Sequence, residues 1–189
     1  MELNIFSTAI VSIALLVGVK VIYVLTAIIA LPQTGGALFC FTHSSKIDAI
    51  LDAIPMKREN KIVDLGCGDG RFLAAASKRY DITGIGYDVN FLAVFMARFR
   101  FAFSPAPIRI SRENFFDVSL SEGDIIFCYL FPDVMEKLAF KLEREMKEGA
   151  LLVSCNFPLL GWTPESILTA DHGVQKDPIY LYRKGVLVK

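Results

Sequence analysis

The chain has 189 residues and a balanced charge, with 20 Lys and Arg against 20 Asp and Glu. This length allows one domain of ordinary size plus a short additional segment. The charge balance argues against a general nucleic-acid-binding protein, which is usually basic. We therefore expect no nucleic-acid partner. The cysteines show no spacing typical of metal ligands, so we expect no metal and buried free thiols at Cys67, Cys128 and Cys155, with Cys40 near a membrane surface.

The first apolar run, residues 4–31, is long enough to span a bilayer, which takes about 20 residues. It lacks the basic start of a signal peptide, so we expect a retained transmembrane anchor with the bilayer as partner. Lys20, near its middle, either extends to the headgroup region or meets an acidic group on a partner helix. Basic residues follow the run and none precedes it, which predicts a single-pass membrane protein with its larger domain on the cytoplasmic or an equivalent side.

Residues 32–59 are predicted to form a connecting segment with one short helix. Apolar residues between Ile47 and Ile54 recur at helical spacing, and Ser44 or Ser45 is a suitable N-cap. His43 precedes these serines, and it is either a hydrogen-bonded surface residue or a catalytic one.

The domain that follows, residues 60–189, begins with a strand, a glycine turn and a helix. The strand covers residues 61–65 and the helix residues 71–80. The turn has the pattern D-x-G-x-G-x-G, at Asp64, Gly66, Gly68 and Gly70. Such a turn, at the end of a parallel strand and the start of a helix, forms a cradle for nucleotide-like ligands. A dinucleotide fingerprint would need its third glycine at residue 71, where Arg stands.

Asp88 ends the next predicted strand, residues 82–87, at about 20 residues after the turn. An acid at this place can accept both ribose hydroxyls of a bound nucleoside. The alternative is that Asp88 caps the helix predicted over residues 91–101, but Asn90 could fill that role.

Five further strands are predicted, at residues 107–110, 123–130, 150–156, 166–170 and 178–184, with a helix over 133–147. The last two strands are expected to form an antiparallel pair. The predicted fold is α/β, with a Rossmann-like sheet of seven strands and helices on both faces. Because ligands bind outside the carboxyl ends of parallel strands, Tyr129 and Pro132 are candidates to line the substrate site.

These motifs resemble those of the class I S-adenosylmethionine (SAM) methyltransferases, whose motif I is similar to residues 63–70. Further motifs are similar to one branch, the membrane-anchored protein lysine methyltransferases that act on the adenine nucleotide translocase and on the c-subunit of ATP synthase. They are Gly84-Ile85-Gly86-Tyr87-Asp88, Glu148-Gly149-Ala150, Phe157-Pro158 with Trp162, and Leu181-Tyr182-Arg183.

The resemblance implies the class I methyltransferase fold and SAM as cofactor. It implies that Asp64 helps to hold the methionine part, that the turn glycines let the cofactor lie against the backbone, and that Asn114 and Phe115 contact the adenine. The alternative for Asn114 and Phe115 is an ordinary polar loop with one buried aromatic residue. The branch usually has Asp at position 114 and Pro-Thr or Pro-Ser near residues 42–44, so these departures leave the substrate open.

The resemblance further implies methylation of lysine side chains in a membrane or membrane-associated protein. Two alternatives are a methyltransferase for a lipid amine or a lipophilic small molecule, and a non-catalytic SAM-binding scaffold. Four aromatic residues either form a wall beside the methylated ammonium or belong to the core; they are Tyr129, Phe131, Phe157 and Trp162.

Overall fold

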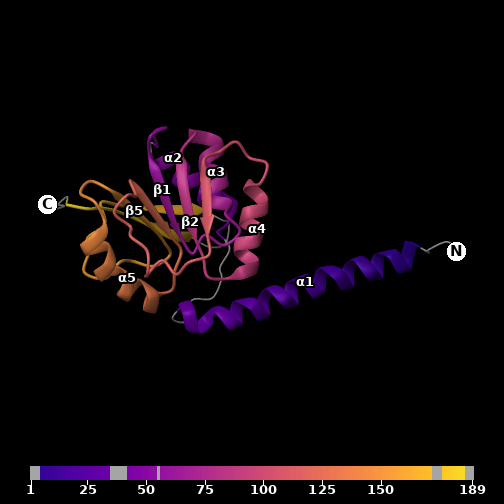
Figure 1. Cartoon of the computed structure of the whole chain (residues 1–189). Coiled ribbons are helices and arrows are strands. Elements are labelled where there is room, and N and C mark those ends of the chain that lie inside the picture. Colours follow the sequence, from indigo (N-terminus) through magenta and orange to yellow (C-terminus); the bar gives the residue numbers. More distant parts are fainter. Residues whose placement is uncertain (1–4, 35–41, 55, 172–175, 186–189) are drawn as a thin grey trace.

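A computed structural model describes residues 5–34, 42–54, 56–171 and 176–185 of the chain. Its centre is a seven-stranded sheet in the order β3-β2-β1-β4-β5-β7-β6 (Figure 1). The strands are β1 (Lys61–Leu65), β2 (Thr83–Tyr87), β3 (Ile108–Ser111), β4 (Ile125–Cys128), β5 (Leu151–Cys155), β6 (Ser166–Asp171) and β7 (Lys176–Arg183). The predicted seven-stranded α/β sheet is confirmed.

The sheet is parallel from β3 to β5 and antiparallel at its other edge. β1 pairs in parallel with both β2 and β4, so the strand order reverses on its two sides. β7 runs antiparallel to β5 and to β6, as predicted for the last two strands. The carboxyl ends of β1, β2 and β4 therefore meet at one edge, the place where open α/β sheets bind ligands.

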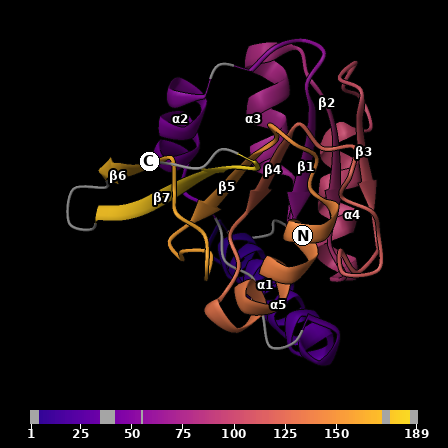
Figure 2. The same ribbon diagram turned by 90° about the vertical axis from the view of Figure 1, so that its left-hand side faces the viewer.

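Helices cover both faces of the sheet, as predicted. Three of them, α2 (Ser44–Ala53), α3 (Arg71–Tyr80) and α4 (Phe91–Phe101), lie on one face, and α5 (Pro132–Glu145) lies on the other (Figures 1 and 2). The side chains of β1 alternate between the two faces of the sheet, and each face has its own hydrophobic core. Ile62 packs in the core on the side of α2, α3 and α4, and Val63 and Leu65 pack in the core on the α5 side. The predicted buried free thiols are confirmed at Cys67, Cys128 and Cys155, while Cys40 lies outside the described residues.

The helix α2 is part of the domain core, although its residues were expected only to connect two parts of the chain. Its apolar residues are buried with those of the sheet and α3, and Ile50 is 0% exposed. Its N-cap is His43, whose side chain accepts a hydrogen bond from the Ser45 amide, so the predicted serine cap is wrong. This cap gives the exposed His43 a structural role at the start of the helix.

The N-terminal apolar run forms one helix, α1 (Ile5–Thr34), whose described apolar side chains are mostly exposed. Polar groups interrupt its surface, with the exposed ammonium of Lys20 near the middle and a Ser12 hydroxyl that donates to the Thr8 carbonyl at 2.9 Å. Within the described ranges, no helix combines the length and the apolar character that crossing a membrane requires. This finding contradicts the predicted transmembrane anchor and the predicted single-pass membrane localisation.

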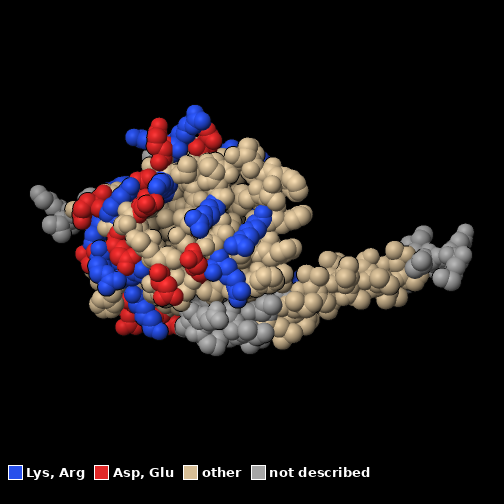
Figure 3. All heavy atoms as spheres, in the orientation of Figure 1, with Lys and Arg blue, Asp and Glu red and all other residues tan. Residues whose placement is uncertain are grey.

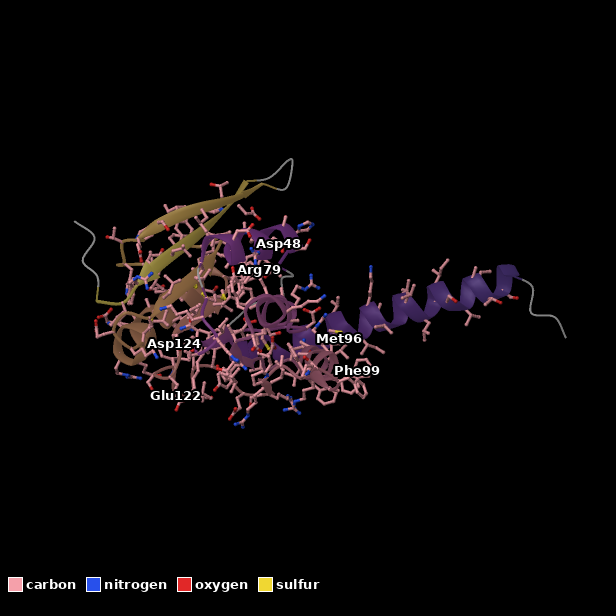
Figure 4. The ribbon with its side chains drawn as sticks, turned by 90° about the horizontal axis from the view of Figure 1, so that it is seen from above. Asp48, Arg79, Met96, Phe99, Glu122 and Asp124 are labelled. Atoms are coloured by element: carbon pink, nitrogen blue, oxygen red, sulfur yellow. The ribbon has the colours of Figure 1, made fainter. Side chains whose placement is uncertain are left out.

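Exposed aromatic residues continue the apolar surface of α1 onto α4, which α1 contacts. Phe91, Phe95, Phe99 and Phe103 recur every four residues, and each is more than half exposed. Figure 4 shows Met96 and Phe99 beside α1. In Figure 3 the charged side chains gather mainly on the side of the domain away from α1. The apolar surface of α1 and α4 is therefore largely separate from the charged surface.

The burial of α2 leads to a test of its contribution to the fold. We expect Ile50→Ala to lower the free energy of unfolding by about 2–4 kcal/mol, because truncation leaves a cavity in the core. Asp48→Ala, at an exposed position of the same helix (Figure 4), should change it by less than about 0.5 kcal/mol. Chemical denaturation of the full chain measures both values, and equal small losses would show that α2 does not stabilise the domain.

Candidate functional site

The site is built on the glycine turn that joins β1 to α3. Gly66, Gly68 and Gly70 have φ angles of +75°, +54° and +74°, which side-chain-bearing residues rarely adopt. A Cβ at Gly86 of β2 would lie 2.7 Å from the Cβ and Sγ atoms of Cys67, so only glycine lets the turn approach the neighbouring strand. The predicted motif residues thus fold into a tight turn at the carboxyl edge of the sheet.

Asp64, the last acid of β1 before the turn, is 1% exposed and lines a pocket with Gly66, Gly68 and Tyr129. Its Oδ2 atom has no hydrogen-bond partner among the described residues. Burial, and then the nearby charges of Asp88 and Asp69, raise the pKa of this carboxyl well above its usual range. A buried acceptor without a donor is costly, and a cationic amine in the pocket would satisfy it.

Asp88, at the end of β2, faces the same turn. Its Oδ2 accepts from the Gly68 amide at 2.9 Å and its Oδ1 from the Asn90 amide at 2.8 Å. Burial raises the pKa of Asp88 in spite of these hydrogen bonds. Asn90 caps α4 by accepting from the Leu92 and Ala93 amides, so Asp88 is not the cap. Each carboxylate oxygen has a second lone pair, and Asp88 can therefore also accept ligand hydroxyls.

A third acid in the turn, Asp69, has a structural role that the sequence did not reveal. It accepts from the Arg71 side chain at 3.0 and 3.1 Å and from Arg100 of α4 at 2.9 Å. Burial alone would raise the pKa of Asp69. The hydrogen bonds and charges of these arginines nevertheless hold this pKa below its usual value. Arg71 also donates to the Thr42 carbonyl at 3.3 Å, which ties the turn to the segment before α2.

Asn114 and Phe115 lie in the loop after β3. The Asn114 Oδ1 atom accepts from the Phe116 amide at 3.0 Å, and Phe115 is buried in the α5-side core with its ring 4.7 Å from that of Phe116. Both side chains are therefore used by the loop itself. Their contact with a cofactor stays a prediction.

The residues after β4 divide between the pocket and the surface. Tyr129 lines the pocket beside Asp64, and its hydroxyl accepts from the Asn156 Nδ2 atom at 2.8 Å. Pro132 is exposed as the first residue of α5 and is not among the described residues that line this pocket. Its role in the substrate site stays a prediction.

The other aromatic residues do not gather into one group with Tyr129. Phe131 and Phe157 form a pair with ring centroids 5.9 Å apart. Trp162 packs edge-on against the buried Tyr182, and the Lys184 ammonium lies 5.3 Å from its ring. Lys184 follows β7, and its backbone N–H donates to the Ala150 carbonyl just before β5. Lys184 therefore lies at the edge of the sheet opposite the pocket, and Trp162 contacts that edge through it.

A larger cleft of about 530 Å³ lies at that opposite edge, where β4 and β5 begin. Four of its charged groups already pair with one another: Lys147 with Asp124, and Arg183 with Glu165 at 2.9 Å. None of the glycine-turn residues lines it. We therefore place the candidate site in the smaller pocket at the carboxyl edge.

The pocket at the carboxyl edge suits a ligand with a cationic amine and a nucleoside. Asp64 offers an unpaired buried carboxylate to the amine, the glycines expose backbone at the turn, and Asp88 offers acceptors beside it. These features fit SAM. Across the described ranges, no group of three potential His, Cys, Asp or Glu ligands could hold a metal ion.

The fold and the site together define a class I methyltransferase that uses SAM. Among solved structures, the RNA methyltransferase from Salinibacter ruber, in complex with S-adenosyl-L-homocysteine, superposes with a TM-score of 0.71. The similarity covers 79% of this chain and 97% of that one at 23% identity, and it establishes the fold alone.

The chain belongs to the family described as the ANTKMT methyltransferase domain, which matches residues 64–166. The protein-lysine N-methyltransferase of Saccharolobus islandicus (strain REY15A) is 30% identical over 147 residues, covering 76% of this chain and 91% of that protein. The human lysine N-methyltransferase of the ATP synthase c-subunit is 33% identical over 114 residues, and the mouse adenine nucleotide translocase lysine N-methyltransferase 34% identical over 127 residues. These matches cover 58% and 66% of this chain but only 48% and 54% of the two animal proteins.

The contrast between Asp64 and Asp69 leads to a paired prediction. Because the pKa of Asp64 is raised, the folded protein holds a proton that the unfolded chain releases, and stability falls as the pH rises between the two pKa values. Asp64→Asn should therefore raise the thermal unfolding midpoint of the cofactor-free protein at neutral pH. The same change should weaken SAM binding by about tenfold or more, because a neutral amide cannot pair with the ammonium.

Asp69→Asn is the matched control in the same turn. The pKa of Asp69 is lowered, so its contribution to stability is present above the unfolded pKa and is lost as the pH falls. Asp69→Asn should therefore lower the unfolding midpoint at neutral pH. Differential scanning calorimetry gives the midpoints and titration calorimetry the SAM affinity. A lowered midpoint for both variants would contradict the assignment of a buried carboxyl group without a hydrogen-bond donor to Asp64.

Proposed function

We propose that this chain transfers methyl groups from SAM to lysine side chains of a protein substrate. The observation that carries the proposal is the unpaired, buried Asp64 carboxylate in a pocket at the carboxyl edge of a methyltransferase sheet. The choice of lysine rests on the relatives, which are named as lysine N-methyltransferases.

We infer a specific role for each residue around the cofactor. SAM supplies a methyl group that is already activated on its sulfonium. Asp64 accepts from the cofactor ammonium, the backbone at Gly66, Gly68 and Gly70 lets the cofactor lie close, and Asp88 accepts from the ribose hydroxyls. Asn114 and Phe115 contact the adenine. These residues bind and orient, and none needs to exchange a proton with the substrate.

The acceptor side must present a neutral amine for in-line attack, so the lysine ammonium would first pass its proton to water. A lysine with its ordinary pKa of about 10.4 is neutral in only about one molecule in a thousand near neutral pH. Tyr129, next to the pocket, presents a ring face that favours a partly desolvated amine and later contacts the methylated ammonium. Alignment of the two reacting groups then supplies most of the rate enhancement.

We further propose that the substrate is a membrane or membrane-associated protein. This narrower proposal is supported by the similarity of the strand-five and closing motifs to the branch described above. Pro132, at the surface end of the same loop as Tyr129, would contact such a substrate outside the pocket.

The experiment that tests this function supplies radiolabelled SAM and the purified full chain to soluble and membrane fractions from a source strain that lacks the gene. We expect a discrete labelled protein band whose hydrolysate contains methyl-lysine, and no label with Asp88→Ala. Label in the lipid phase would show that the substrate is a lipid amine and not a protein. Measurable SAM binding without label in either phase would show that the chain is a non-catalytic scaffold and not an enzyme.

Tyr129→Ala separates the acceptor side from the cofactor side. We expect methyl transfer at saturating SAM to fall by about tenfold or more, because the acceptor amine loses its aromatic contact, while the SAM dissociation constant changes by less than about threefold. Labelled-methyl transfer and titration calorimetry measure the two quantities. Equal losses of transfer and SAM affinity in a folded variant would assign Tyr129 to the cofactor instead.

A further inference from the structure

Lys46, on α2, places a buried ammonium beside the pocket. The residue is 1% exposed, and its Nζ atom donates to the Asp177 carboxylate at 2.7 Å and to the Asn156 Oδ1 atom at 2.5 Å. The same Nζ atom lies 4.8 Å from the centroid of the Tyr129 ring. One cation therefore contacts residues from three other segments of the chain.

Asn156 connects this ammonium to the Tyr129 hydroxyl. Its amide oxygen accepts from Lys46, and its amide nitrogen donates to Tyr129 at 2.8 Å. Its backbone is held as well, because its N–H donates to the Pro178 carbonyl at 2.8 Å and its φ angle is +67°. An asparagine in this conformation cannot turn its amide away without breaking both hydrogen bonds. The face of the Tyr129 ring and its hydroxyl are thus fixed from two directions.

The network meets the candidate site at Tyr129, which lines the pocket together with Asp64. We propose that Lys46 is a positioning residue for methyl transfer: with Asp177 as its counter-ion, it holds Asn156 and Tyr129 in the orientation that receives the acceptor amine. This inference rests on the proposed function, because it assigns Tyr129 to the acceptor side. Lys46 itself is too deeply buried to touch the substrate.

The energetics favour such a role over a purely stabilising one. A buried ion pair seldom stabilises a fold more than apolar side chains of the same volume would, because both charges must leave water. A buried ion pair instead fixes the orientation of the side chains around it, because a buried ammonium with few possible partners allows few side-chain arrangements. Here those partners are Asp177, Asn156 and the Tyr129 ring.

The test compares Lys46→Met with wild type in the full chain. We expect kcat at saturating SAM to fall by about tenfold or more, while the dissociation constant of SAM changes by less than about threefold. Tyr129→Phe removes the hydroxyl to which Asn156 donates. When this change is added to Lys46→Met, kcat should fall by less than about twofold further, because the two changes disrupt the same hydrogen-bond network. The proposal would be overturned if the effects of the two changes on kcat were independent and multiplied. Parallel losses of kcat and SAM affinity would overturn it as well.

Lys184→Met is the matched control. Lys184 is also a buried lysine beside an aromatic ring, with its ammonium 2.6 Å from Glu143 Oε1 and 5.3 Å from the Trp162 ring. It contacts the opposite edge of the sheet, so its loss should alter tryptophan fluorescence and stability but not kcat. A fall in kcat equal to that of Lys46→Met would reduce the role of Lys46 to general stability.

A second variant keeps the test valid should Lys46→Met not fold. Asn156→Gly removes both side-chain hydrogen bonds and retains a residue suited to a φ angle of +67°. We expect the same pattern as for Lys46→Met, with kcat lowered by about tenfold and SAM affinity nearly unchanged. Unchanged kcat in this variant would overturn the proposal.

A readout independent of turnover separates this inference from the proposed function. 3-Fluorotyrosine placed at position 129 reports its ring environment by fluorine NMR. Its resonance should shift in Lys46→Met and in Asn156→Gly but not in Lys184→Met. No methylation by wild type together with these shifts would refute the proposed function alone. An unchanged resonance in Lys46→Met and Asn156→Gly would refute the positioning role.

Discussion

The buried, unpaired carboxylate of Asp64 is the constraint on which the site depends. It is the last residue but one of a central strand with neighbours on both sides, it is 1% exposed, and its Oδ2 atom has no donor among the described residues. A fold tolerates such a group only if the remaining structure compensates for its cost. The two-sided packing of β1 provides this compensation, because Val63 and Leu65 pack against α5 while Ile62 packs against α3.

The three acids around the turn have different partners, and the difference indicates what the site lacks. Asp69 is neutralised by Arg71 and Arg100, and Asp88 is bonded by two backbone amides. Of these three acids, Asp64 alone has an oxygen that no cation or donor of the described residues contacts. The side chains of Arg71 and Arg100 bond Asp69, and neither is bonded to Asp64 among the described contacts. A positively charged ligand completes this arrangement, which fits a sulfonium cofactor that also carries an amine.

Elements with a local signal could be predicted from the sequence, and features made by distant residues could not. Alternating or helical apolar spacing located the sheet strands and their helices, and Asn90 was recognisable as a cap. Apolar composition located α1 as a helix but led to the wrong inference of a membrane span. The bonds of Arg100 to Asp69 and of Lys46 to Asn156 join residues 31 and 110 positions apart, and no periodicity marks such pairs.

The two halves of the site differ in the same way. Most of the proposed cofactor half comes from one short stretch, Asp64 to Asp88, so a motif can identify it, and only Asn114 and Phe115 are proposed from farther along the chain. The proposed acceptor half is assembled from α2, the ends of β4 and β5, and β7, through Lys46, Tyr129, Asn156 and Asp177. The family match covers residues 64–166 and so leaves out both Lys46 and Asp177. If the acceptor side sets the choice of substrate, relatives that share the cofactor motif can differ in substrate through contacts that lie outside it. The segment before the motif, where this chain departs from the pattern usual in the branch it resembles, is then where such differences should be sought.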